Sequence, residues 1–321
     1  MDANENAFGS TIPKIAGVDL SRYPDPLAEK LRVEFGKFAG VSAKKVIVGN
    51  GSDEIIWLIL LAFVEADEEV LTFTPTFSMY RVFANLLGLR VREASFETNF
   101  MLDTEKFISK ISAKTKLIFL CSPNNPTGQV LPLADIEKIL RSKKIVVVDE
   151  AYIEFAPEKS SVRLLAKYPN LIVLRTFSKA WGLAGLRIGC ALADLAAIAI
   201  LQKVRAPYSV DSLSQKFALD ALKNSAKMMA TVKKILAEKE KLTAKLWSLG
   251  FTVFPSDTNF VLVKFPPEIS AAAIQKKLLQ NFGIVVRDFS NKKLLANCVR
   301  ITVGTSAENS KLLAALTKIL K

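Results

Sequence analysis

The sequence predicts an α/β protein whose main sheet is mostly parallel and covered by helices on both faces. Short apolar runs alternate with helical segments from about residue 46 to residue 192. These runs are apolar at successive positions, which indicates strands that are buried on both faces. Beyond residue 211 the pattern changes to long helical stretches with a few short strands, which predicts a second, smaller α+β domain.

Seven strands are expected in the first part of the chain. They cover 45–48, 69–73, 89–94, 116–121, 144–149, 171–176 and 186–192. Between them, the segments 52–65, 76–88 and 132–142 have the apolar spacing of helices that pack on a sheet.

One long helix is expected from Asp211, because apolar residues recur at helical spacing as far as Leu246. Asp211 or Ser212 would be its N-cap, and Gly250 follows its last turn. Strands near 251–254, 259–265, 284–287 and 298–303, with helices near 270–281 and from about 306, complete the chain. We therefore expect an N-terminal arm at 1–27, a large α/β domain at 28–210, and a linking helix with a small α+β domain at 211–321.

The composition excludes several classes of protein. The longest apolar run, 55–64, is about half the length that a bilayer-crossing helix needs, and no basic segment followed by an apolar one marks a signal peptide. Cys121, Cys190 and Cys298 form no CxxC pair and no disulfide framework. We expect a cytoplasmic protein with reduced, mostly buried thiols and no contact with a membrane.

Charge and histidine content narrow the chemistry further. The net charge is +13, but the densest group of lysines, at 233–245, alternates with glutamates and apolar residues as a solvated helix face does. Nucleic-acid binding is therefore not expected. The chain has no histidine, which excludes Ser-His-Asp and Cys-His nucleophile systems and histidine-ligated metals. A lysine, carboxylate, tyrosine, cysteine or cofactor must then move protons near neutral pH, and no metal site is predicted.

Four of the predicted strands end in polar residues. The endings are GNGSDE at 49–54, SPNNPTG at 122–128, DEAY at 149–152 and FSK at 177–179. Because ligands of open α/β sheets bind at the carboxyl ends of the strands, these four endings together predict a pocket.

Three kinds of group meet there. The glycines and backbone N–H groups of GNGSDE offer an anion site at a helix N-terminus, to which Ser178 and Arg187 could add a hydroxyl and a charge; a plain helix cap is the alternative. Asp149 follows an apolar run, so its carboxylate must be paired or hydrogen-bonded, with a structural salt bridge as the alternative. Lys179 at a strand end would be a partly desolvated, nucleophilic amine, unless it is simply a solvated cation. An amine, a buried acid and a phosphate cradle match pyridoxal 5′-phosphate, whose chemistry needs no histidine.

At these residues the sequence resembles the fold-type I (class II) pyridoxal-phosphate aminotransferases, and among them the histidinol-phosphate aminotransferase family. The resemblance covers nearly the whole chain. It runs in order through DANEN (2–6), RYPDP (22–26), VGNGSDE (48–54), TPTFSMYR (74–81), CSPNNPTG (121–128), VVDEAYIEF (147–155), RTFSKAWGLAGLRIG (175–189), FPSDTNFVLV (254–263), VRDF (286–289) and VRITVGT (299–305).

The resemblance implies roles for particular residues. Lys179 would form the Schiff base with the cofactor, and Asp149 would face its pyridinium nitrogen. Tyr152 and Asn125 would hydrogen-bond the phenolic oxygen, and Phe77 would stack on the ring unless it is an ordinary core aromatic. The cofactor phosphate would be held by Gly51, Ser52, Asp53, Ser178 and Arg187.

The resemblance also implies a homodimer with shared active sites, because Tyr23 would reach the phosphate of the neighbouring subunit's cofactor. Contacts to the substrate would come from Asn6, Tyr23, Asn125, Arg287 and Arg300. Two arginines suit substrates that carry either a phosphate or carboxylates.

The activity that the resemblance implies is ping-pong transamination in histidine biosynthesis. L-Histidinol phosphate and 2-oxoglutarate would be interconverted with imidazole acetol phosphate and L-glutamate. Three alternatives stay open: an aromatic amino acid aminotransferase, a threonine-phosphate decarboxylase and a basic, non-enzymatic binding protein. The decarboxylases typically carry a His-Gly-Gly-Asn motif near their start, which a chain without histidine lacks.

Overall fold

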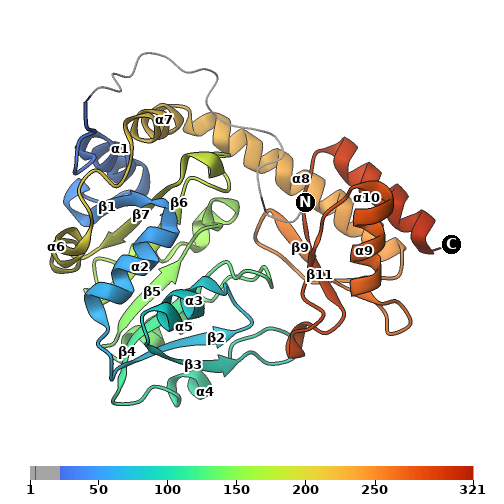
Figure 1. The fold of residues 1–321 in the computed structure, drawn as a ribbon, viewed down its shortest axis with the longest axis horizontal. Coiled ribbons are helices and arrows are strands. Elements are labelled where there is room, and N and C mark those ends of the chain that lie inside the picture. The colour runs from blue at the N-terminus through green and yellow to red at the C-terminus, as the bar shows by residue number, and fades with distance from the viewer. Residues whose placement is uncertain (1–3, 5–21, 321) are drawn as a thin grey trace.

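The seven predicted apolar runs form one sheet, as the sequence predicts. The computed structural model describes residue 4 and residues 22–320, and Figure 1 shows its fold. The strands are β1 (Val46–Asn50), β2 (Glu69–Thr74), β3 (Arg90–Ser95), β4 (Thr115–Cys121), β5 (Ile145–Asp149), β6 (Leu171–Thr176) and β7 (Ile188–Ala193). Their order is β1-β7-β6-β5-β4-β2-β3, and only β7 runs antiparallel to its neighbours. A mostly parallel sheet is therefore confirmed.

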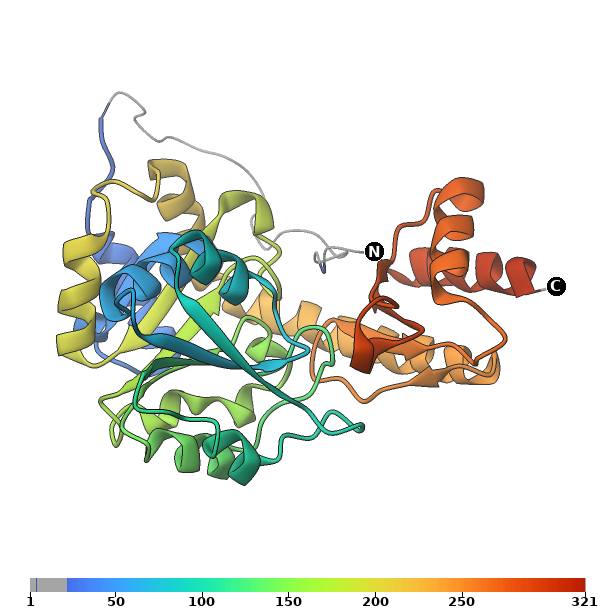
Figure 2. The same ribbon diagram turned by 60° about the horizontal axis from the view of Figure 1, so that its bottom comes forward.

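Helices cover both faces of this sheet (Figures 1 and 2). They are α1 (Glu29–Ala39), α2 (Gly51–Phe63), α3 (Met79–Leu86), α4 (Thr104–Ile108), α5 (Leu133–Leu140) and α6 (Leu195–Val204). Short 3₁₀ turns are η1 (Ala43–Lys45), η2 (Ile153–Phe155), η3 (Pro157–Lys159), η4 (Ser161–Leu164) and η5 (Ala184–Leu186). All residues of β6 and β7 are buried, which explains why these strands are apolar at successive positions.

The prediction of one long helix from Asp211 is wrong, because the chain forms two helices there. These are α7 (Ser212–Lys223) and α8 (Ser225–Ser248), separated at Asn224. The side-chain Nδ2 of Asn224 donates to the backbone carbonyl of Asp220 at 2.7 Å. This carbonyl would otherwise accept the backbone N–H of residue 224 in a continuous helix, so the side chain competes with helical continuation. The predicted N-cap is confirmed, since Asp211 accepts from the Ser214 N–H at 2.8 Å.

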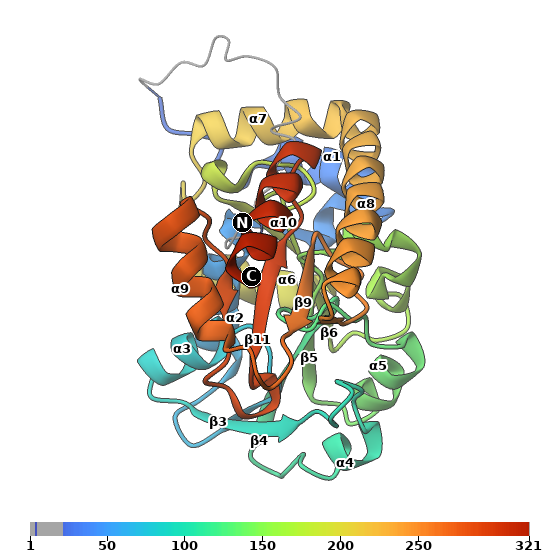
Figure 3. The same ribbon diagram turned by 90° about the vertical axis from the view of Figure 1, so that its right-hand side faces the viewer.

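A second, antiparallel sheet follows α8. Its strands are β8 (Thr252–Val253), β9 (Phe260–Lys264), β10 (Arg287–Asp288) and β11 (Cys298–Thr302), in the order β10-β11-β9-β8. The turn η6 (Lys293–Leu295) precedes β11, and the helices are α9 (Ala271–Phe282) and α10 (Ser306–Leu320). Figure 3 shows α9 and α8 on either side of the strands of this sheet, with α10 between them. The smaller α+β unit is confirmed, although its third predicted strand, 284–287, is reduced to two residues, Arg287 and Asp288.

A small apolar cluster joins the two sheets. Phe100, in the turn after β3, packs with Leu262, Leu295 and Cys298 of the C-terminal part. Its ring lies 4.9 Å from that of Phe254, edge to face. Burial of this aromatic surface thereby attaches the four-stranded sheet to the turn that follows β3.

The state of the cysteines and the length of the helices match what the composition predicts. Cys121, Cys190 and Cys298 are free and buried, and burial raises the pKa of the Cys298 thiol to about 11. Among the described residues, no helix has both the length and the apolar composition needed to cross a bilayer.

Candidate active site

The four polar strand endings lie along one edge of the seven-stranded sheet. The strand register pairs Asn50 with Ile188, and Thr176 with Gly189. It also pairs Asp149 with Leu174 on β6 and with Cys121 on β4. The endings of β1, β6, β5 and β4 are therefore neighbours in space, as their order in an open sheet requires.

One end of this edge is suited to bind an anion. Gly51 opens α2 with φ +79°, a backbone conformation that favours glycine, and a Cβ there would displace the Arg187 guanidinium, which lies 2.7 Å from that position. A Cβ on Gly189 would lie 2.4 Å from the Ser52 nitrogen, so β7 packs directly on the start of α2. The first N–H groups of a helix have no partner within the helix. Together with Arg187 they attract negative charge, although Asp53 already pairs with Arg187 at 3.0 Å.

Ser178 and Lys179 lie beside this anion site. The Phe177 N–H donates to the Ile188 carbonyl at 3.0 Å, which continues the pairing of β6 with β7 and brings Ser178 next to Arg187. Ser178 is buried and tied to Thr176, whose hydroxyl donates to its Oγ at 3.0 Å. Lys179 is half-buried, and its Nζ lies 5.7 Å from the centre of the Tyr152 ring. The amine is thus close to the segment that follows Asp149.

Asp149 is a buried carboxylate, with 3% of its surface exposed. Its Oδ2 accepts from the Tyr80 hydroxyl at 2.7 Å, and its Oδ1 accepts from the Ala151 N–H at 3.1 Å. Burial raises the pKa of Asp149 from 3.8 to about 6, although both hydrogen bonds oppose the increase. The charged form therefore lacks part of the solvation that water would give it, which suits a position opposite a cation.

Two further buried acids, Glu150 and Glu154, lie close to Asp149 in the chain and are paired with an arginine. Arg175 on β6 donates to Glu150 at 2.8 Å and to Glu154 at 3.0 Å. Glu150 also accepts from the Ser161 hydroxyl at 2.6 Å. This cluster fixes the segment that carries Tyr152 to β6. Sequence reasoning missed it, although a lone arginine in the apolar run 171–176 was a signal.

Tyr152 is held by an asparagine that sequence reasoning did not select. Asn4 is buried, its N–H donates to the Thr302 hydroxyl at 3.1 Å, and its Oδ1 accepts from that hydroxyl at 2.8 Å. Its Nδ2 then donates to Tyr152 Oη at 2.9 Å, and Asn259 donates to its carbonyl at 3.0 Å. Because Tyr152 Oη accepts from Asn4, its own proton can be donated elsewhere. Asn6, the residue selected instead from the same DANEN motif, lies outside the described residues.

Arg300 brings the four-stranded sheet to the same site. It is buried, and its Nη1 donates to Asn125 Oδ1 in the loop after β4. The guanidinium lies 5.2 Å from the ring centre of Phe260 and 5.8 Å from that of Phe289, at distances favourable for cation–π contacts. Arg287 is exposed and pairs with Arg300 across β10 and β11, so both side chains are on one face of the sheet.

The loop before β9 fixes this arrangement. The Asp257 N–H donates to the Gly128 carbonyl at 2.7 Å, and its carboxylate pairs with Lys159 at 3.0 Å. Lys239 on α8 donates to the carbonyls of Ser256 and Thr258. Burial lowers the pKa of Lys239 to about 8. The loop that carries Asn125 is thereby attached to the sheet that carries Arg300.

Two predicted residues lie at the margins of the site. Phe77 is half-buried and meets Tyr80 edge to face, with ring centres 5.5 Å apart. Tyr23 is 82% exposed and stacks on Tyr208 at 4.7 Å. Within one chain, no described contact brings Tyr23 to Lys179 or Asp149.

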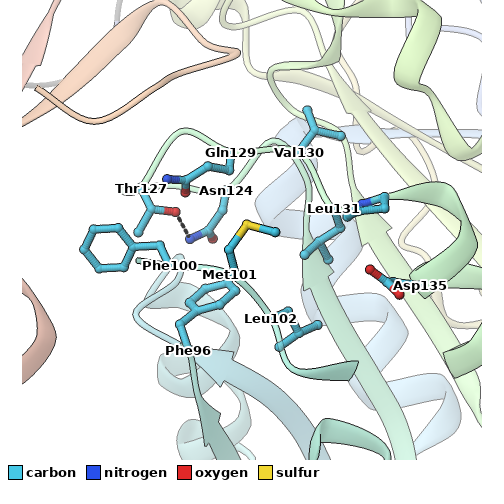
Figure 4. Close-up of a pocket in the computed structure, with 11 residues that line it drawn as sticks. Phe96, Phe100, Met101, Leu102, Asn124, Thr127, Gln129, Val130, Leu131 and Asp135 are labelled. Atoms are coloured by element: carbon cyan, nitrogen blue, oxygen red, sulfur yellow. Dashed lines mark hydrogen bonds between the residues drawn. The ribbon is translucent and has the colours of Figure 1, made fainter. Parts of the chain in front are cut away.

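A separate apolar pocket lies between the turn after β3 and the loop before α5 (Figure 4). Phe96, Phe100, Met101 and Leu102 contribute to its wall, where Asn124 donates to the Thr127 hydroxyl at 2.8 Å. None of the predicted site residues lines it, and its lining contains no cation that would attract an anionic substrate. We therefore assign it no part in the site.

The raised pKa of Asp149 predicts a stability effect in the ligand-free protein. A raised carboxyl pKa contributes stability that is present below about pH 4 and is lost as the pH rises through about 6. Asp149→Asn avoids this loss, so we expect it to increase the free energy of unfolding by ~1–3 kcal/mol at pH 8 and by almost nothing at pH 4. Urea denaturation of both proteins at the two pH values measures this difference. A variant that is less stable than the wild type at pH 8 would contradict the assignment.

Comparison with known proteins agrees with the geometry. The family model for aminotransferases of class I and II matches residues 3–316. The histidinol-phosphate aminotransferase of Caldanaerobacter subterraneus subsp. tengcongensis is 42% identical over 100% of this chain and 92% of its own length. That of Parabacteroides distasonis is 42% identical over 98% of this chain and 89% of its own length.

Solved structures show the same likeness. The histidinol-phosphate aminotransferase from Sinorhizobium meliloti, in complex with pyridoxal-5′-phosphate, superposes with a TM-score of 0.92 at 28% identity, over 99% of this chain and 90% of that one. The L-threonine-O-3-phosphate decarboxylase from Porphyromonas gingivalis has a TM-score of 0.80 at 26% identity, over 94% of this chain and 91% of that one. From the family match and the full-length relatives, the chain belongs to the class I and II aminotransferase family.

Proposed function

We propose that the chain is a pyridoxal 5′-phosphate-dependent aminotransferase that moves an amino group between L-histidinol phosphate and 2-oxoglutarate, with imidazole acetol phosphate and L-glutamate as products. One observation carries the proposal. A half-buried amine (Lys179), a buried carboxylate (Asp149) and a helix N-terminus with an arginine (Arg187) lie along a single sheet edge.

The residues present fit this cofactor. β5 and β7 are separated by β6 alone, so the backbones at Asp149 and at Arg187 are about 10 Å apart, at ~4.8 Å per strand. That separation suits an elongated ligand with a basic ring nitrogen at one end and a phosphate at the other. Gly51, Ser52, Asp53, Ser178 and Arg187 would hold the phosphate, and Lys179 would hold the group covalently.

When bound, the cofactor supplies a protonated ring that accepts electrons from the reacting carbon of the substrate. Asp149 keeps the ring nitrogen protonated, because a carboxylate with few donors gains most from a cationic partner. Lys179 Nζ moves the proton at the substrate carbon that carries the amino group. Tyr152 would donate a hydrogen bond to the phenolic oxygen of the cofactor, because Tyr152 Oη already accepts one from Asn4 Nδ2 and keeps its own proton.

Substrate recognition would rest on the arginines. Arg300 is held against two aromatic rings and Asn125, so its planar group is ordered before a substrate arrives. A guanidinium pairs through two parallel hydrogen bonds with either a phosphate or a carboxylate. Arg300, with Arg287 on the same face, can therefore serve both half-reactions, and Asn6 remains a proposed contact.

We further propose a cytoplasmic homodimer with shared sites, without a nucleic-acid or membrane partner, and a division into residues 1–27, 28–210 and 211–321. The segment around Tyr23 is anchored to the chain behind it. Arg205 donates to the Pro26 carbonyl, and Gln215 donates to the Asp25 carbonyl at 2.9 Å. This anchoring presents the exposed Tyr23 outward, where it could reach the phosphate site of a second subunit.

Covalent labelling tests the cofactor. We expect borohydride reduction of the yellow holoprotein to fix one pyridoxyl group on Lys179, and Lys179→Ala to abolish the label. Lys239 is the natural competitor, because burial lowers the pKa of its amine to about 8. Peptide mapping by mass spectrometry locates the label, and modification of Lys239 in place of Lys179 would refute the assignment.

A substrate panel tests the specificity. We expect kcat/KM for L-histidinol phosphate to exceed that for phenylalanine, tyrosine and threonine phosphate by at least about tenfold, or ~1.4 kcal/mol of transition-state binding. Arg300→Lys keeps the charge but loses the forked donor, so it should raise KM for both histidinol phosphate and 2-oxoglutarate. A tenfold preference for phenylalanine would instead make the chain an aromatic aminotransferase, and carbon dioxide release from threonine phosphate would make it a decarboxylase.

Mixed dimers test the sharing of sites. If Tyr23 acts on the partner's site, unfolding and refolding Tyr23→Ala together with Lys179→Ala creates heterodimers in which one of the two sites is complete. Activity should then rise from near zero to about a quarter of the wild-type value, because half of a random mixture is heterodimeric. Activity that does not rise above that of the separate variants would show that Tyr23 acts within its own chain or not at all.

A further inference from the structure

Tyr80 is a buried polar group to which the reaction assigns no role. It lies in the first turn of α3, and none of its surface is exposed. Its hydroxyl donates to Asp149 Oδ2 at 2.7 Å. A buried tyrosine hydroxyl needs a hydrogen-bond partner. A buried carboxylate is an unusual partner, because burying an ionised acid is costly unless the acid is itself paired or hydrogen-bonded.

The direction of this hydrogen bond is fixed by charge. Burial and the neighbouring Asp149 raise the pKa of Tyr80 well above 10, so the hydroxyl keeps its proton and donates it. Asp149 Oδ1 is engaged by the Ala151 N–H at 3.1 Å. Each carboxylate oxygen can accept more than one hydrogen bond, so the two donors orient the carboxylate and leave lone pairs for a third.

The Tyr80 ring is itself held in place. It stacks on Phe119 of β4 with ring centres 4.6 Å apart and an interplanar angle of 4°. On another side it meets Phe77 edge to face at 5.5 Å. Tyr80 therefore connects the acid of the site with the aromatic ring of Phe77, and its side chain is fully buried against β4.

We propose that Tyr80 is a positioning residue for the cofactor, which it serves through Asp149. Its hydroxyl orients the Asp149 carboxylate and keeps it ionised to meet the protonated ring nitrogen, while its ring sets the position of Phe77. The proposal rests on the proposed cofactor and adds a residue that acts without touching it.

Tyr80→Phe tests the hydroxyl alone, because the ring and its stacking are kept. We expect the dissociation constant of pyridoxal 5′-phosphate, measured by fluorescence titration of the cofactor-free protein, to rise about tenfold. We expect kcat per bound cofactor to fall by about the same factor, with KM for the amino donor changed less than about twofold. Thr72→Val is the matched control: Thr72 is buried, and its hydroxyl donates to the Phe119 carbonyl at 3.0 Å. It should lower thermal stability and leave the cofactor constant and kcat unchanged.

A double-mutant cycle with Asp149→Asn separates action through Asp149 from general packing. In the Asp149→Asn background, Tyr80→Phe should change the cofactor dissociation constant by less than about twofold. A tenfold effect that persists without the carboxylate, or a Tyr80→Phe protein that behaves like Thr72→Val, would overturn the proposal. If the proposed function itself were wrong, the wild-type protein would bind no pyridoxal 5′-phosphate. That result is distinguishable from both outcomes above, in which the wild-type protein binds the cofactor.

Discussion

Burial of the Asp149 carboxylate at the end of β5 determines what must surround it. The strand is covered on both faces, so its last residue lies in the protein interior, where an ionised acid without donors is costly. The chain supplies two donors, the Tyr80 hydroxyl and the Ala151 N–H. These do not fully replace water, since the pKa of Asp149 stays raised at about 6. Asp149 is therefore suited to face a cation. Lys179 and the anion site at Gly51 and Arg187 lie along the same sheet edge, where an elongated ligand that starts at Asp149 would extend.

Glu150, the next residue, shows the contrast between an acid neutralised within the fold and the acid that we propose for the cofactor. It is equally buried, but Arg175 and Ser161 neutralise and bind it within the chain. Its ion pair belongs to the fold, and it fixes the segment that carries Tyr152. Among the described residues, the hydrogen-bond donors to Asp149 are two neutral groups, the Tyr80 hydroxyl and the Ala151 N–H. Glu150 thus has its counter-charge within the fold, whereas Asp149 is the acid that we propose for the cofactor, and their partners, not their positions in the sequence, distinguish the two.

The elements of the fold could be predicted because strands buried on both faces leave a local signal, and so could the four strand endings. The break at Asn224 could not, because it depends on one side-chain hydrogen bond that competes with a helix of otherwise suitable periodicity. The site residues that were missed, Asn4 and Tyr80, share a cause. Each contacts a proposed site residue that lies 148 or 69 positions away in the chain. From the local sequence alone, Asn4 is one polar residue of the N-terminal arm, and Tyr80 is an ordinary aromatic residue of the core.

Asp149 and Lys179 must face the same ring if the proposed cofactor binds at this site, and a crystal structure of the protein with pyridoxal 5′-phosphate measures this directly. We predict continuous electron density from Lys179 Nζ to the cofactor, an Asp149 oxygen about 2.8 Å from the ring nitrogen, and the phosphate at the start of α2 beside Arg187. A cofactor whose ring nitrogen faces solvent or another side chain, with Asp149 closed off in a different cavity, would contradict the account.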